Sequence, residues 1–516
     1  MDLASKEFFS HKIKTAEEIA HIIGLRPRGK SVIMCHGTFD VVHPGHIRHM
    51  LYAKTKANIL IASLTSDEHI KKGNMRPYVP EDLRAVNLAA LEMVDFVVID
   101  RDPTPIKNLT IIKPDYFAKG YEYTSGQVHP KTQEEITILD SYGGEMIFTP
   151  GDIVYSSSYL IDLAPPSIGV EKLLTLMKAE DITFQNLRDA VQKLKGIKVH
   201  VVGDTIVDSY TYCSMAGGMT KTPTMSVRLE NKLDFVGGAG IVAKHLSAAG
   251  AEVIFSSVIG DDDFGKFVIK DISESDIHFN PIIDATRPTT NKNAIVVQNY
   301  RLLKVDTLDN RSISDKVMAR LQKAITETKV DAITFCDFRH GIFNRSTIPE
   351  LTKAIPEGVF KVADSQVASR WGNILDFQNF DLITPNEREA RFALGDQDSI
   401  IRPLSLELHK KSKCKTLILK CGDRGIITYR SNSPVHHRAF FSIETFADKV
   451  VDAVGAGDAL LAYSTLAMVA TSNEVVASIL GNMAAGIECE HDGNWPVTPD
   501  LLLKKIEDIE KKVQYV

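Results

Sequence analysis

The chain has 516 residues, too many for one ordinary hydrophobic core, so we expect two or three domains. It contains 44% hydrophobic and 24% charged residues and carries a formal net charge of −6, as in a water-soluble globular protein. That mild acidity argues against a protein that wraps nucleic acid or lies on anionic lipid. No apolar run approaches the roughly 20 residues of a membrane span. The N-terminus lacks the basic-then-apolar layout of a secretory signal, and the six cysteines form no CxxC pair, so we expect a cytoplasmic protein.

Short β-branched runs alternate with amphipathic stretches, which is the pattern of an α/β protein. The first series predicts strands at 31–35, 58–64, 95–100, 115–120 and 145–150. The Pro-Pro pair in LAPPSIG (163–169) ends it, and a helical connector follows. The second series predicts strands at 198–204, 252–260, 331–338, 360–365, 381–386 and 416–429. We therefore expect two α/β domains, residues 1–163 and 196–516, joined by a connector over 164–195.

Two histidines three residues apart follow the first predicted strand, in HGTFDVVHPGH (36–46). His43 and His46 can share one face of a helix start, where unpaired N–H groups and the helix dipole favour phosphate oxygens. Two imidazoles there can stabilise charge at the α-phosphorus of a triphosphate, while a phosphate oxygen of the second substrate attacks and pyrophosphate leaves. Taken alone, an HxxH pair is also typical of a surface pair or of half a metal site.

GTFDVVHPGH resembles the nucleotidyltransferase signature G-x-F-D-x-x-H-x-G-H, which in that family also lies between a strand and a helix. The resemblance implies a cytidylyltransferase-like domain, a small Rossmann-like sheet, with both histidines catalytic and Gly37, Thr38 and Phe39 at the nucleotide. Residues 64–95 resemble the family's second segment. It implies phosphate contacts by Lys71, Lys72 and Arg76, with Lys72 among the catalytic residues, although the lysine pair alone is typical of a solvated loop.

Two further segments of the first part resemble the same family. Lys119 and Gly120 end a predicted strand where the family places a K-G turn beside the nucleotide. VYSSSYLI (154–161) stands where the family reads I-S-T-T, so Ser156 and Ser157 would contact phosphates. This segment departs from the pattern at Tyr155 and equally fits a plain helix N-cap.

A glycine loop feeds an apolar helix in VVDAVGAGDALLAY (450–463). Gly455 and Gly457 allow close backbone approach, and the helix start is an anion hole. Asp458 can take a proton from a substrate hydroxyl while the amides neutralise the transferred phosphoryl group. The composition GxGD alone is also that of many tight turns.

This loop resembles the D-x-x-G-A-G-D signature of the ribokinase-like (PfkB) carbohydrate kinases, and further motifs follow the family's order along the second part. The resemblance implies a ribokinase-like α/β domain with a small β lid and Asp458 as catalytic base. It implies metal and phosphate contacts by Asn386 and Glu389, and sugar contacts by Asp204, Asp208, Gly237 and Gly238. It implies nucleotide contacts by Asn386, Lys420, Gly422, Gly425, Gly455, Ala456, Gly457 and Asn482.

Three features depart from the kinase pattern. Val454 replaces the usual threonine before GAGD, and Ile241 stands where an asparagine often bonds the sugar. An apolar residue cannot replace that bond, so the acceptor differs or the kinase half is weakened. The lid-like stretch 214–232 is longer and more polar than we expect.

With both domains taken together, the chain resembles the bacterial bifunctional ADP-heptose synthases, with the domain order reversed. They imply that Mg-ATP phosphorylates a sugar phosphate, such as D-glycero-D-manno-heptose 7-phosphate, and that the sugar 1-phosphate is joined to a nucleotide. ATP is the expected nucleotide, and CTP is the second candidate. The same motifs also fit a polyol or non-heptose substrate, or a kinase-like half without catalysis. We expect a homodimer or higher homo-oligomer, with no nucleic-acid or membrane partner.

Overall fold

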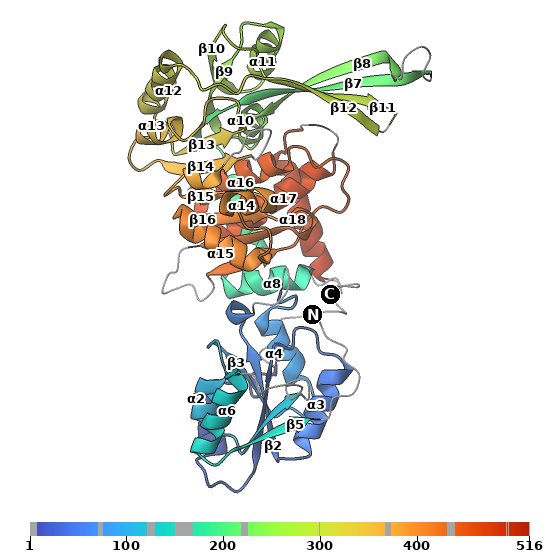
Figure 1. Ribbon diagram of the computed structural model, residues 1–516, viewed down its shortest axis with the longest axis vertical. Helices are drawn as coiled ribbons and strands as arrows, with labels where there is room; N and C mark the ends of the chain where they lie inside the picture. The colour runs from blue at the N-terminus through green and yellow to red at the C-terminus, as the bar shows by residue number, and fades with distance from the viewer. Residues whose placement is uncertain are drawn as a thin grey trace. The chain divides into compact units, whose positions relative to one another are not determined.

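The computed structural model describes residues 8–70, 76–120, 130–149, 169–217, 225–298, 300–366, 373–430, 439–491, 493 and 495–514 (Figure 1). The chain forms two compact units, Met1–Ala179 with Val513–Val516, and Glu180–Lys512. The predicted connector is divided between them: helix α8 (Gly169–Ala179) belongs to the first unit and α9 (Phe184–Gln192) to the second. No helix in these described ranges is long and apolar enough to cross a bilayer.

The first unit is built on a parallel five-stranded sheet of order β3-β2-β1-β4-β5. All five predicted strands are present, and the α/β class is confirmed. The strands are β1 (Val32–Gly37), β2 (Ile59–Thr65), β3 (Phe96–Asp100), β4 (Tyr116–Gly120) and β5 (Glu145–Thr149). The helices with α8 are α2 (Ala16–Ile23), α3 (Pro44–Lys54), α4 (Glu81–Ala89), α5 (Ile106–Ile112), α6 (Pro130–Ser141) and the 3-10 turn η1 (Asp67–His69).

Strand β1 is apolar on both faces because helices cover both sides of the sheet. Ile33 and Cys35 belong to a core cluster that includes residues of α3 and α4, and Val32 and Met34 to another with residues of α2 and α5. Burial of this strand fixes the position of Gly37 at its carboxyl end, where open α/β sheets bind ligands.

The second unit contains a nine-stranded sheet of order β10-β9-β6-β13-β14-β15-β16-β17-β18. Its strands are β6 (Lys198–Gly203), β9 (Glu252–Ile259), β10 (Ile277–Ile283), β13 (Ala332–Asp337), β14 (Phe360–Ser365), β15 (Leu382–Ile383), β16 (Thr416–Lys420), β17 (Ile426–Arg430) and β18 (Phe440–Ile443). The helices with α9 are α10 (Ala239–Ala248), α11 (Asp263–Ser273), α12 (Asp315–Glu327), α13 (Thr347–Lys353), α14 (Glu387–Leu394), α15 (Ile401–Ser412), α16 (Ala456–Thr471), α17 (Glu474–Cys489) and α18 (Pro499–Gln514). The turns η3 (Ile374–Asp376) and η4 (Gly422–Arg424) complete it.

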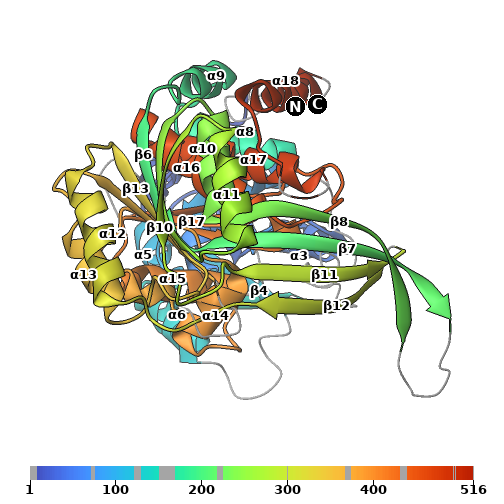
Figure 2. The same ribbon diagram turned by 90° about the horizontal axis from the view of Figure 1, so that it is seen from above.

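A separate four-stranded sheet forms the lid of this unit, and Figure 2 shows its strands projecting from the helix-covered body. Its order is β12-β11-β7-β8, from β7 (Thr205–Gly217), β8 (Ser226–Gly238), β11 (Asn291–Val297) and β12 (Tyr300–Thr307). The lid stretch predicted at 214–232 is, where described, the far ends of β7 and β8. The lid is therefore larger than that stretch, and it includes two later strands.

Candidate active sites

The histidine pair of the first unit lies at the start of α3. His43 is the N-cap residue of α3, and its ring lies 3.9 Å from that of His46 between centroids. The edge of Phe39 packs on His46 at 5.2 Å. Gly45 leaves room for this arrangement, because a Cβ there would come within 2.8 Å of the His43 ring. The structure therefore brings together the two predicted catalytic histidines and the G-T-F turn that precedes them.

Hydrogen bonding and burial set the charge of both rings. The Gly45 N–H donates to Nδ1 of His43 at 3.1 Å, so the neutral His43 ring carries its proton on Nε2 and can donate from there. Burial, with Arg48 nearby, lowers the pKa of His43. Burial, with His43 and His49 nearby, lowers the pKa of His46 to about 4. Both rings are therefore neutral near pH 7, and each carries one N–H group rather than a fixed positive charge.

Two ion pairs, one buried and one partly buried, hold the turn between β1 and α3. Asp40 accepts from Arg76 at 3.1 Å and from the backbone N–H groups of Tyr78 and Val79. Arg84 is fully buried, pairs with Asp67, and donates to the carbonyl oxygen of Thr38. Arg76, predicted to bind phosphate, is thus bonded to the signature aspartate in this structure.

The remaining predicted residues of the first unit lie near the same sheet edge or outside the described residues. Lys119 is the residue before the last of β4, the neighbour of β1, and forms an ion pair with Glu135 and a 3.2 Å hydrogen bond to Thr132. Gly120 follows as the last residue of β4. Four predicted residues lie outside the described residues: Lys71, Lys72, Ser156 and Ser157.

The glycine loop of the second unit opens helix α16. Gly455 is its N-cap residue with φ of 86°, a left-handed conformation that favours glycine. Ala456 and Gly457 form the first helical positions, and Asp458 follows within the first turn. Burial raises the pKa of Asp458 to about 8, with Asp364 adding to the rise and Lys420 opposing it. A carboxyl group of that pKa suits a general base near neutral pH.

Charged and polar side chains at the ends of neighbouring strands lie close to Asp458. Lys420, the last residue of β16, donates to Asp364 at 3.0 Å, and a Cβ on Gly457 would lie 3.2 Å from its ammonium. Asn386 caps α14 in a reciprocal box: it donates to Glu389 from both its backbone and its amide, and the Glu389 N–H donates back. A backbone bridge between Asn386 and Lys420 joins the two pairs, and Lys420 acts on the charge of both Glu389 and Asp458, so the four predicted residues form one cluster.

Sequence reasoning missed Asp364 in this cluster. It is buried near the carboxyl end of strand FKVADS (360–365), and Thr384 donates to it at 3.0 Å. An aspartate at the carboxyl end of a buried strand, as in KVHVVGD, is the signal that could have found it.

The predicted sugar-binding residues divide between the body and the lid. The Asp204 carboxylate accepts from the backbone N–H groups of Phe338 and His340 at 3.1 Å each and from Ile342 at 3.4 Å. Its observed contacts are thus with a body loop. Asp208 lies on lid strand β7 and helps raise the pKa of Asp458. Gly237 and Gly238 end β8, where a Cβ on Gly238 would meet the Asp204 carbonyl oxygen at 2.5 Å.

The predicted adenine-side residues surround the end of β18. Gly425 closes the η4 turn that begins at Gly422, and a Cβ there would overlap the Ile443 carbonyl oxygen. The Asn482 amide donates to the Glu444 carbonyl oxygen at 2.8 Å. Gly425 and Asn482 therefore both lie against the backbone of residues 443–444, at the end of β18.

Comparison with known families decides the relationship. Residues 197–499 match the model of the pfkB family carbohydrate kinases. The chain belongs to the pfkB family. Residues 34–162 match the cytidylyltransferase-like model. The pfkB domain thus follows the cytidylyltransferase-like domain in this chain.

Curated relatives of this pfkB-family chain carry the name Bifunctional protein HldE. The protein from Pelobacter propionicus is 26% identical over 329 residues, which are 62% of this chain and 66% of the relative. The one from Rhodopseudomonas palustris is 26% identical over 334 residues, 63% of this chain and 66% of the relative. The matched stretch therefore spans just under two thirds of the relatives' own length. These matches confirm the resemblance to bifunctional ADP-heptose synthases, with the domain order reversed.

Solved structures share the fold of the pfkB part. Phosphofructokinase-2 from Escherichia coli with substrates and products gives a TM-score of 0.51 at 15% identity, over 61% of this chain and 99% of that one. The same enzyme with potassium gives 0.50 at 15% identity, with the same coverage. At this identity the likeness concerns the fold alone.

Magnesium, which the pfkB resemblance implies, fits the cluster around Glu389. Among the described residues no group of three or more His, Cys, Asp and Glu side chains is arranged to hold a metal. Mg²⁺ commonly keeps waters and uses only one or two carboxylates together with substrate phosphates. Burial and the nearby Asp364 raise the pKa of Glu389 to about 7, against the effect of Lys420. A cation bound at the Glu389 carboxyl group would lower this pKa again and keep the group ionised. The carboxyl oxygens of Glu389 therefore suit Mg²⁺.

Proposed function

We propose that the chain is a bifunctional enzyme that makes a sugar nucleotide in two separate active sites. The pfkB unit transfers the γ-phosphoryl group of Mg-ATP to the anomeric hydroxyl of a sugar phosphate, with D-glycero-D-manno-heptose 7-phosphate as the first candidate. The other unit joins a sugar 1-phosphate to the α-phosphorus of ATP and releases pyrophosphate. We place the protein in the cytoplasm, where ATP is found and cysteine thiols stay reduced.

The observation that carries the proposal is that one chain holds both a half-buried carboxyl group of raised pKa at a glycine loop and a neutral histidine pair at a helix start. Asp458 takes the proton of the acceptor hydroxyl, and the amides of the loop stabilise the transferred group. Lys420 and Asn386 hold nucleotide phosphates, and Glu389 with Asn386 would hold the Mg²⁺ that supplies charge neutralisation when bound.

In the first unit, His43 and His46 donate to the phosphates of the nucleotide as charge develops at the α-phosphorus. The attacking group is a phosphate oxygen of the sugar 1-phosphate, so the protein contributes position and electrostatics. Domain order has no effect on this scheme, because the intermediate diffuses between sites.

Mass spectrometry of the purified chain with Mg-ATP and D-glycero-D-manno-heptose 7-phosphate tests the first step. A sugar bisphosphate is the expected product. Pyrophosphate release from ATP or CTP with supplied sugar 1-phosphates tests the second step, and greater release from CTP would correct the nucleotide. An absence of any phosphorylated product across heptose, hexose, pentose and polyol phosphates would refute the kinase assignment.

A second acceptor is favoured by one residue. Ile241 lies buried in α10, 1% exposed, and offers no hydrogen bond where the family often has an asparagine. A non-heptose sugar or a polyol phosphate is therefore the second candidate acceptor. A panel of pentose, hexose and polyol phosphates in the same assay separates the two.

A further inference from the structure

The pfkB unit contains a cavity of about 1040 Å³ beside the loop that follows β13, and we name it the side cavity. Among the described residues, its lining comes from the segment 310–312, the loop 339–346, the residues 373–376 and Phe392 of α14. None of these described residues belongs to the lid sheet or to the residues placed around Asp458 above. Ligand pockets usually measure about 300–1000 Å³. The side cavity therefore has room for a ligand larger than a monosaccharide phosphate.

Arg339 supplies a buried cation to the side cavity. It is 8% exposed, and its guanidinium group lies 2.9 Å from Asp337 and 3.5 Å from Asp376. Its φ is 62°, a left-handed conformation that is uncommon for a residue other than glycine and that recurs at functional sites. Burial raises the pKa of Asp337 to about 7, with Arg339 opposing the rise. At neutral pH the Asp337 carboxyl group therefore balances the charge of Arg339 only in part.

A second arginine lies against the same Asp376 carboxylate. One oxygen of Asp376 is 3.5 Å from Nη2 of Arg339, and the other is 3.9 Å from Nε of Arg345. Both separations exceed the length of a charge-assisted hydrogen bond, about 2.7–2.9 Å. Two guanidinium groups that share one loosely held carboxylate leave positive charge for a further anion. Their placement on either side of one carboxylate suits the two neighbouring phosphate groups of a diphosphate.

Neutral donors and an aromatic side chain complete the lining. The Asn373 side-chain oxygen accepts from the Leu375 N–H at 2.9 Å, and its NH₂ group forms no hydrogen bond to any described residue. The Ser312 hydroxyl accepts from the Asn344 amide at 2.8 Å and keeps its own proton for another acceptor. Phe392 is 36% exposed at the cavity. These groups suit phosphate oxygens and sugar hydroxyls, and the ring offers an apolar surface to a base.

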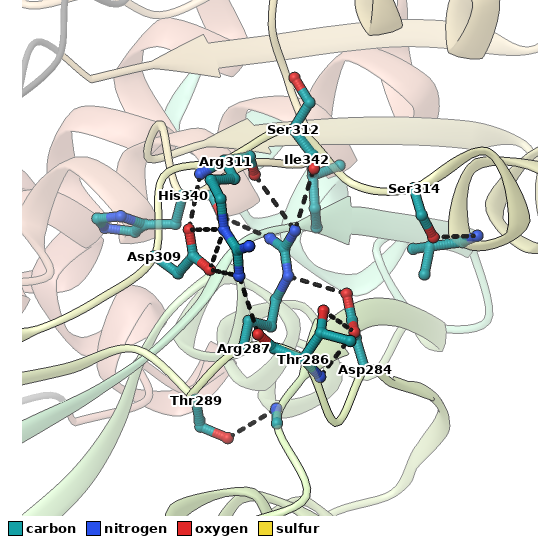
Figure 3. Close-up of polar contacts among 12 residues, drawn as sticks. Asp284, Thr286, Arg287, Thr289, Asp309, Arg311, Ser312, Ser314, His340 and Ile342 are labelled. Atoms are coloured by element: carbon teal, nitrogen blue, oxygen red, sulfur yellow. Dashed lines mark hydrogen bonds and ion pairs between the residues drawn. The ribbon is translucent and has the colours of Figure 1, made fainter.

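One wall of the side cavity is held in place by Arg287 (Figure 3). Arg287 is buried, pairs with Asp284 at 3.0 Å, and donates to the carbonyl oxygens of His340 and Ser312. Gly341 has a φ of 110°, and a Cβ there would come within 2.6 Å of the Arg287 guanidinium group, so this close approach needs glycine. The wall is thus positioned before a ligand arrives, which reduces the ordering cost of binding.

We propose that the side cavity binds a nucleoside diphosphate, either free or joined to a sugar, at a site separate from both catalytic sites. Arg339 and Arg345 hold the diphosphate, and Asn373 and Ser312 donate to oxygens of the ligand. Both forms of the ligand follow from the proposed reactions, because the kinase step releases ADP and the transferase step makes a sugar nucleotide. The binding itself requires neither reaction, so it can be measured without turnover.

Hydrogen exchange followed by mass spectrometry of the full-length protein locates the ligand. The probes are ADP, ADP-glucose and inorganic pyrophosphate, each with Mg²⁺, and peptides over 341–346 and 373–376 report on the side cavity. We expect ADP or ADP-glucose to slow exchange in these peptides. In Arg345→Met the Kd read from them should rise at least about 10-fold, as for a lost hydrogen bond to a charged group. Peptides over 420–430 report on the kinase nucleotide site and should respond to ADP equally in both proteins.

Arg320→Met is the matched control, since Arg320 is exposed on α12 and is not among the residues that line the cavity. The Arg345 side chain is 88% exposed, so Arg345→Met should keep the wild-type melting temperature. Slower exchange with ADP-glucose and not with ADP would assign the site to the sugar nucleotide, and the reverse would assign it to the free nucleotide. The inference is wrong if neither probe slows exchange at the side cavity, if Arg345→Met responds as the wild type does, or if pyrophosphate alone has the full effect. None of these results would alter the two proposed reactions.

Discussion

Asp204→Asn separates a loop anchor from a sugar ligand. In this structure the carboxylate accepts three backbone N–H groups of residues 338–342, and an asparagine would turn its NH₂ group toward one of these donors. One lost hydrogen bond with an unsatisfied donor costs about 1–3 kcal/mol. Burial raises the pKa of Asp204, which means that the ionised carboxylate is costly in the fold, and the neutral amide removes that cost. We therefore expect a loss of about 1–2 kcal/mol in the free energy of unfolding of this unit.

Scanning calorimetry of the full chain measures this loss as a fall of about 2–4 °C in the melting temperature of the pfkB unit. Asp208→Asn is the comparison, because Asp208 lies on the lid and should affect KM for the acceptor more than stability. An unchanged melting temperature for Asp204→Asn, together with a raised acceptor KM, would show that Asp204 is a sugar ligand and that the anchor interpretation is wrong.

Three further predictions concern single residues. His46→Ala should lower pyrophosphate release about 100-fold. Because burial lowers the pKa of His46 to about 4, His46 stays neutral between pH 6 and 8, and its titration should cause no loss of wild-type transferase rate in that range. Asp458→Asn should lower kinase turnover at least about 100-fold. Since the pKa of Asp458 is raised to about 8, wild-type kcat/KM for the acceptor should rise with pH up to that value, and a flat profile would contradict the role of Asp458 as base. Gly481→Ala should destabilise the α16–α17 pair by about 1–3 kcal/mol in urea unfolding, because its Cβ would overlap the Ser464 hydroxyl; equal midpoints would refute this packing argument.

Much of the fold could be predicted from local patterns. The central strands are continuous apolar runs bounded by turn residues, and the five strands of the first sheet appear where those runs occur. The lid strand β12 could not be found in this way, because most of its residues are exposed and show no apolar alternation. Strand β15 has only two residues within a predicted run of six, because its last residues turn into the α14 cap at Asn386.

The candidate sites show the same division. The signature histidines and the GAGD loop could be placed from sequence because each lies where a strand or loop meets a helix N-terminus. The partners that position them are distant in sequence: Arg84 reaches Thr38 across 46 positions, and Asp204 holds a loop more than 130 positions away. Single-sequence patterns carry no signal for such pairs.

The two units should catalyse two different reactions in separate sites. Time courses by ³¹P NMR with Mg-ATP, a sugar phosphate and, separately, a supplied sugar 1-phosphate test it in the His46→Ala and Asp458→Asn proteins. We predict that Asp458→Asn stops bisphosphate formation and leaves pyrophosphate release intact, and that His46→Ala does the opposite. Loss of both reactions in either folded variant, or of neither reaction in both, would show that the two units do not hold two independent active sites.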